Sequence, residues 1–127
     1  VPAFPDEESL HRLLGRAALL ADAGLYFEVH ELLEPAWMRA PDPERIALQA
    51  LIQIAVALHH AENGNREGAV SLLTEGLAKL AARRSVLPLD TGEWEAALGQ
   101  TLTALRDGGI RPPVPPWPHP VSTSPRP

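Results

Sequence analysis

The chain contains no cysteine, and this absence together with its charge excludes several classes of protein. Without cysteine there is no disulfide, thiolate nucleophile or cysteine-based zinc site, which fits the reducing cytoplasm that we expect as its location. Any metal ion would have to be held by His, Asp or Glu side chains. Because the formal net charge is -5 and binding to phosphates relies on Lys and Arg, we expect no nucleic acid as a partner.

The sequence also has no apolar run long enough to cross a membrane, so we expect no membrane partner. Its most apolar stretch, IALQALIQIAVAL at 46–58, is shorter than the roughly 20 residues that a bilayer-spanning helix needs. The stretch VPAFPDEES at 1–9 is acidic and lacks the apolar core of a signal peptide, so we expect no export. A chain of 127 residues, 45% of them hydrophobic, predicts a single compact domain.

Apolar residues recur at helical spacing in five segments, and strand-like alternation of useful length is missing. The segments are expected from Asp6 to Gly24, from about 25 to 38, from Pro43 to about Asn63, from Asn65 to about Leu80, and from Thr91 to about Leu105. Short breaks between helices favour antiparallel hairpins. We therefore predict an all-α fold, a compact bundle of about five helices built from antiparallel helical hairpins over residues 1–109.

Proline is concentrated at the end of the chain, where eight of the 14 prolines fall between residues 112 and 127. This composition predicts an extended Pro-rich C-terminal tail over 110–127 instead of a second domain. The stretch PPVPPWPHP is typical of ligands for an aromatic groove, although a tail that packs on its own domain or stays mobile is the commoner outcome.

Two polar stripes are predicted on neighbouring helices. In YFEVHELLE at 26–34, a rotation of about 100° per residue places His30 and Glu34 on one stripe, while Glu31 points toward solvent. On the next helix Gln53 and His60 share a stripe of an otherwise apolar surface, where each buried polar group without a partner costs about 1–3 kcal/mol. We therefore expect a polar pocket between the second and third helices. Its expected members are His30, Glu34, Gln53 and His60, with Gln49 and Trp37 as further binding residues.

This pocket has two interpretations. As a divalent-metal site, it would use His30, Glu34 and His60 as ligands for zinc, iron or manganese, with Glu31 as the catalytic base of a hydrolase. Against this, the second histidine of the H-E-x-x-H motif is replaced by Glu34. As a closed network of buried hydrogen bonds, the same groups would fix how the helices dock and would need no ligand.

The run AGLYFEVHELLEPAW, followed by LQALIQIAVALHHAENGNREGAVSLLTEGL, resembles domain-of-unknown-function family 309 over about residues 17–80. The resemblance implies an α-helical bundle and the label of a predicted metal-dependent hydrolase, without an established reaction. Pro35 and the long tail depart from the family pattern. Residues of the family's motifs match Glu28, His30, Glu31, Glu34, Trp37, Gln53 and His60.

A different function is suggested by two similar segments. ADAGLYFEVHELL and ENGNREGAVSLL each resemble the turn and second helix of a tetratricopeptide hairpin, and they lie about 40 residues apart. Repeat arrays usually need three or more units, so the likeness also fits ordinary hairpin packing. The main alternative to a metal site is therefore a helical protein-interaction module. Its partner would be an unknown small molecule or protein, and a homodimer is left open.

Overall fold

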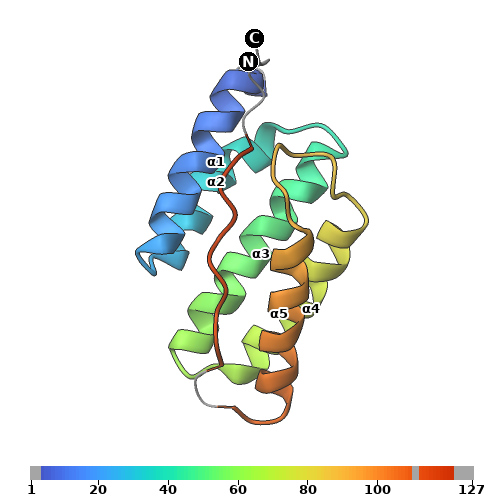
Figure 1. The fold of residues 1–127 in the computed structure, drawn as a ribbon. Coiled ribbons are helices and arrows are strands. Elements are labelled where there is room, and N and C mark those ends of the chain that lie inside the picture. The colour runs from blue at the N-terminus through green and yellow to red at the C-terminus, as the bar shows by residue number, and fades with distance from the viewer. Residues whose placement is uncertain (1–3, 110–111, 122–127) are drawn as a thin grey trace.

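The computed structural model describes residues 4–109 and 112–121, and within these residues the chain forms five helices and no strand. The predicted all-α fold is confirmed. Each helix packs mainly against the helices that precede or follow it along the chain, in an antiparallel row (Figure 1). None of the helices in the described ranges is long and apolar enough to cross a bilayer. The helices are α1 (Glu7–Asp22), α2 (Tyr26–Arg39), α3 (Glu44–Glu62), α4 (Arg66–Ala81) and α5 (Gly92–Arg106).

Side chains before two of the helices fix where those helices begin. The Asp6 carboxylate accepts a hydrogen bond from the Ser9 amide at 2.8 Å, and this bond lowers the pKa of Asp6. The side-chain oxygen of Asn65, Oδ1, accepts from the Gly68 amide at 3.0 Å at the start of α4. Both contacts satisfy amides in the first turn that have no partner within the helix. The predicted starts of α1 and α4 therefore agree with the structure.

Helices α1, α3 and α5 end in the same kind of turn. Gly24, Gly64 and Gly108 follow these helices with φ angles of 76, 78 and 87°, a left-handed backbone that favours glycine. In each turn the amide after the glycine donates to a carbonyl of the preceding helix, as in a Schellman motif. The three pairs are Leu25 with Leu20, Asn65 with His60 and Gly109 with Ala104, at 2.9, 2.8 and 2.8 Å.

Helix α3 lies between α2 and α4 and supplies much of the core. Its fully buried large side chains are Leu48, Leu51, Ile54 and Leu58. Helix α4 comes so close that Gly76 leaves no room for a side chain, because a Cβ atom there would lie 2.8 Å from Ile54 Cγ1 and 3.1 Å from the Ala50 carbonyl oxygen. A small residue at position 76 therefore allows the tight contact between α3 and α4.

The Pro-rich tail packs on its own domain. Residues 112–121 are extended and run back along the bundle between α1 and α5 (Figure 1). The Trp117 side chain is only 4% exposed, and its ring centroid lies 4.8 Å from that of Trp94. The parts of the predicted tail at 110–111 and 122–127 lie outside the described residues.

A buried carboxylate fixes the loop between α4 and α5. Glu95 on α5 accepts hydrogen bonds from the Thr91 hydroxyl at 2.6 Å and from Arg84 Nε at 3.0 Å. The hydrogen bond to Glu95 and its negative charge raise the pKa of Arg84. Since a buried carboxylate needs a charge partner or hydrogen bonds, these contacts hold the loop against the start of α5.

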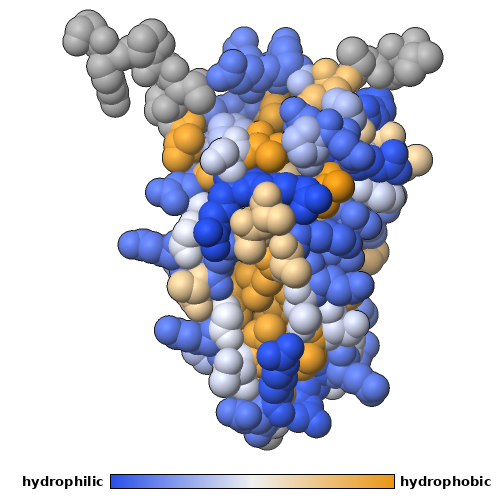
Figure 2. Space-filling model, turned by 90° about the vertical axis from the view of Figure 1, so that its right-hand side faces the viewer, coloured by the Kyte–Doolittle hydropathy of each residue, from blue (hydrophilic) through white to orange (hydrophobic). Residues whose placement is uncertain are grey.

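The side of the molecule formed by α4 and α5 is largely hydrophilic. Figure 2 shows a narrow apolar strip that runs down this side between hydrophilic side chains. Scattered apolar side chains are ordinary on protein surfaces. Within the described part of the chain, most large apolar side chains lie in one core, so we treat the five helices and the packed tail as one folded unit.

The contact at Gly76 predicts opposite effects for two glycine-to-alanine changes. Gly76→Ala should lower the stability by about 1–3 kcal/mol, because the new methyl group overpacks the contact with Ile54 and Ala50. Gly99→Ala on α5 is the matched control, since a Cβ there meets nothing within 4 Å. Its higher helix propensity should leave the stability unchanged or raise it by about 1 kcal/mol. Thermal unfolding checks both, and a stable Gly76→Ala protein would contradict the close packing.

Candidate functional site

His30 and Glu34 lie one turn apart on α2 and contact each other. His30 Nε2 is 3.0 Å from Glu34 Oε2, and the two side chains are 24% and 48% exposed. The other ring nitrogen of His30, Nδ1, is buried and has no hydrogen-bond partner among the described residues. The two residues therefore form a partly open pair at the surface of α2.

Two residues of the predicted pocket on α3 contact other parts of the fold. Gln53 accepts a hydrogen bond from Lys79 Nζ of α4 at 3.0 Å, instead of meeting His30 and Glu34. His60 lies at the end of α3, where its Nδ1 is 3.4 Å from the Asn65 side-chain nitrogen. The physical reason is that α3 has two neighbours. A polar side chain on its surface can bond to α4 as well as to α2, whereas the prediction from the sequence placed the pocket against α2 alone.

The histidine that α3 turns toward α2 is His59. The Phe27 ring lies between the two helices, with its centroid 5.4 Å from the rings of both His30 and His59. His60 is rotated by about 100° from His59 on the helix, which carries it away from α2. Phe27 is 43% exposed, so this aromatic and histidine cluster borders the solvent.

The predicted metal ligands are not gathered into one site. Within residues 4–109 and 112–121, no group of three or more His, Asp or Glu side chains is placed to hold a metal ion. His30 and Glu34 supply two donors, whereas the third predicted ligand, His60, contacts the turn before α4. The proposed base Glu31 is exposed on α2. The pair of His30 and Glu34 thus supplies two donors, fewer than the three or four protein ligands that a bound zinc ion typically has.

Trp37 has a structural contact of its own. The Arg45 guanidinium of α3 lies 4.9 Å from the Trp37 ring centroid, in a cation–π arrangement that joins the end of α2 to the start of α3. The Trp37 Nε1 atom is buried without a partner among the described residues. Gln49, also predicted as a binding residue, is half-buried on α3.

Tyr26, at the start of α2, is the one nearby group with a clear electrostatic perturbation. Its phenol is partly buried, and the carboxylates of Glu62 and Asp22 lie near enough to act on it. Burial is the larger cause and these two charges the smaller, and together they raise the pKa of Tyr26. The raised pKa keeps the Tyr26 phenol neutral at physiological pH.

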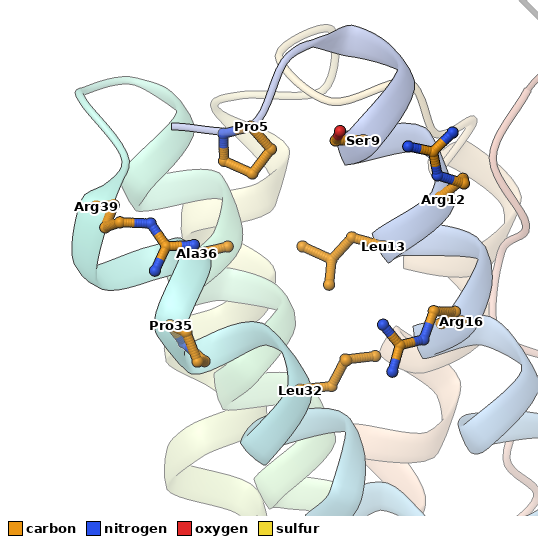
Figure 3. Close-up of a pocket in the computed structure, with 9 residues that line it drawn as sticks. All are labelled: Pro5, Ser9, Arg12, Leu13, Arg16, Leu32, Pro35, Ala36 and Arg39. Atoms are coloured by element: carbon orange, nitrogen blue, oxygen red, sulfur yellow. The ribbon is translucent and has the colours of Figure 1, made fainter. Parts of the chain in front are cut away.

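A hollow of about 380 Å³ lies between α1 and α2, away from the predicted pocket. Figure 3 shows Arg12 and Arg16 on α1 opposite Arg39 on α2, with Leu13 and Leu32 between them. The spacing of Arg12 and Arg16, four residues apart, is visible in the sequence. Arg39 is far from them along the chain, so only the packing of the α1–α2 hairpin brings the three together.

Comparisons with known proteins show which sequences part of this chain is similar to. Residues 14–72 match the model of the family described as Domain of unknown function (DUF309). The chain is also similar to the uncharacterized protein YpuF of Bacillus subtilis (strain 168), with 41% identity over 71 residues. That match covers 53% of this chain and 41% of the relative, so the chain spans less than half of that protein's length. No solved structure matches the chain.

The matched region begins within α1 and ends within α4, so it includes the α2–α3 pair with His30, Glu34 and Gln53. Helix α5 and the Pro-rich tail lie beyond it. The resemblance found in the sequence is confirmed, because residues 14–72, just under half of the chain, match the model of domain-of-unknown-function family 309.

Proposed function

We propose that the protein is a helical-repeat interaction module that binds an extended, proline-rich peptide in the groove between α1 and α5. The observation that carries this proposal is the position of residues 112–121, which lie in that groove as an extended segment of the same chemistry. The proposal develops the tetratricopeptide-like alternative and makes binding, not catalysis, the main activity.

The repeat character of the fold supports the proposal. The α1–α2 and α3–α4 hairpins turn at Gly24 and Gly64, 40 positions apart, with the same hydrogen bonds around each glycine. The buried positions of the second helices also correspond at this offset, for example Leu33 with Leu73 and Ala36 with Gly76. Stacked helical hairpins form extended concave surfaces that repeat proteins use for binding.

The third turn, at Gly108, is followed by prolines instead of a helix. Proline lacks the amide hydrogen that a helix needs and clashes with the preceding turn, so residues 112–121 stay extended. They take the place of a sixth helix and lie between α1 and α5 (Figure 1). An extended ligand therefore already occupies the groove, supplied by the same chain.

The contacts in the groove are those by which proteins recognise extended proline-rich peptides. An aromatic ring, Trp94, packs edge-on against Trp117. The hydroxyl of Thr101, which is fully buried, donates to the Pro113 carbonyl at 2.6 Å and lies farther, 3.3 Å, from the Ala97 carbonyl. Aromatic surfaces together with donors to backbone carbonyls suit a preformed polyproline conformation.

The far end of the segment is held at α1 and at the loop before α5. His119 Nε2 lies 2.8 Å from Asp22 Oδ2, and His11 Nε2 donates to the Val121 carbonyl at 2.9 Å. The Val121 amide donates to the Pro88 carbonyl, also at 2.9 Å. The groove thus offers polar contacts at both ends and an apolar, tryptophan-lined centre.

A competition experiment tests the groove. A synthetic peptide with the sequence of residues 112–121, PPVPPWPHPV, should bind full-length Trp117→Ala protein at least about tenfold more tightly than wild-type protein. The reason is that the wild-type tail competes as a tethered ligand at an effective concentration in the millimolar range, whereas Trp117→Ala weakens that competitor. Fluorescence anisotropy of a labelled peptide measures both affinities.

Two controls make this test decisive. Circular dichroism checks that Trp117→Ala remains helical, and His119→Ala, an exposed change in the tail, is a milder variant expected to act in the same direction. Adding Trp94→Ala to Trp117→Ala should remove the binding. The proposed groove would be contradicted if the folded Trp117→Ala protein does not bind the peptide. It would also be contradicted if the Trp117→Ala protein still binds the peptide after Trp94→Ala is added.

A divalent metal is the second candidate, favoured by the 3.0 Å contact between His30 and Glu34. Histidine and carboxylate side chains are both zinc ligands, and residues four apart on one helix face the same side. The remaining ligands would have to come from water or from a movement of another donor, because a third described side chain is not in place.

Metal analysis of protein purified without a histidine tag tests this candidate. A bound metal at the pair predicts about one equivalent of zinc, iron or manganese per chain, its loss in His30→Ala, and a lower melting temperature with chelator. His11→Ala, whose imidazole lies at the tail, is the matched control and should keep the metal. Metal-free wild-type protein with a melting temperature that chelator does not change would contradict metal binding at this pair.

A further inference from the structure

The hollow between α1 and α2 carries a local charge opposite to that of the whole chain. The protein has a formal net charge of -5, yet three of its 11 Lys and Arg residues line this hollow, and none of the described residues that line it is acidic. Arg12 forms an exposed ion pair with Glu8, in which Arg12 Nη1 lies 2.8 Å from Glu8 Oε1. Arg16 and Arg39 form no ion pair with any residue that the structure describes.

The floor of the hollow is apolar. Leu13 of α1 and Leu32, Pro35 and Ala36 of α2 line it below the arginines. Figure 3 shows the guanidinium groups of Arg16 and Arg39 pointing from opposite sides toward the space above this floor. The hollow therefore combines a ring of donors with an apolar base, and its volume of about 380 Å³ is sufficient for a small molecule.

We infer that this hollow binds an amphiphilic anion, a small molecule with a short apolar chain and a carboxylate or phosphate head. The head would accept hydrogen bonds from Arg16 and Arg39, because the planar guanidinium donates two parallel bonds to either group. The chain would lie on Leu13 and Leu32. A bound anion would also reduce the repulsion between Arg16 and Arg39, which lack an ion-pair partner among the described residues.

Pro35 is one of the residues that line the floor of this site. The Pro35 ring adds apolar surface to the floor, and α2 continues past Pro35 as a helix to Arg39. Arg39 in the last turn of α2 is close to the helix carbonyls, so its charge is favourably placed even before a ligand binds. The site is separate from the groove between α1 and α5.

Titration calorimetry with full-length protein tests the inference. Octyl phosphate and octanoate are the two probes, and they distinguish a phosphate head from a carboxylate head. At least one should bind roughly tenfold or more tightly than octanol, which lacks the charge, and than inorganic phosphate, which lacks the chain. Arg16→Gln and Arg39→Gln should each weaken this binding by about tenfold, since each removes a charged hydrogen-bond donor.

The matched control is Arg106→Gln. Arg106 lines a different hollow between α4 and α5 and donates to Thr74 at 3.1 Å, so its loss should leave the affinity unchanged. Failure of both probes to bind wild-type protein would overturn the inference. So would binding that is equally strong for octanol or inorganic phosphate, or binding that is unaffected by Arg16→Gln and Arg39→Gln.

Discussion

The left-handed glycine at the end of α1, α3 and α5 is the constraint on which the rest of the structure depends. Gly24, Gly64 and Gly108 reverse the chain in the same way, because each glycine adopts a positive φ and each following amide bonds back to the helix. Two of these reversals produce helical hairpins. The third sends the proline-rich segment back along the bundle, and this sets the overall plan.

The groove follows from that plan. Consecutive helices pack on one another, so α1 and α5 lie at the two ends of the row and are joined mainly by the tail. A buried hydroxyl on α5, that of Thr101, and a buried tryptophan, Trp94, face the extended segment. The polar residues of α2 and α3, by contrast, bond in separate pairs, which is why binding explains the geometry better than a shared catalytic centre.

Helical spacing, glycine and proline were sufficient to predict the fold. The five helices, the turns at Gly24 and Gly64 and the extended tail all depend on local rules of backbone conformation, which act over a few residues. The pairing of His30 with Glu34 was equally local, because residues four apart on a helix are neighbours.

The partners of residues on different helices could not be predicted in this way. Gln53 bonds to Lys79 because α3 has a neighbour on each side, and the amphipathic pattern of one helix does not choose between them. Arg39 reaches the same hollow as Arg12 and Arg16 through the packing of the α1–α2 hairpin. The packing of Trp117 against Trp94 likewise depends on where α5 lies relative to the tail.

The central claim is that the groove between α1 and α5 recognises an extended proline-rich peptide. Nuclear Overhauser contacts between an unlabelled peptide of residues 112–121 and isotopically labelled Trp117→Ala protein test it most directly. The account predicts contacts from the peptide tryptophan to the Trp94 ring and from its second proline to Thr101. Peptide contacts at another surface, with Trp94 and Thr101 undisturbed, would contradict it.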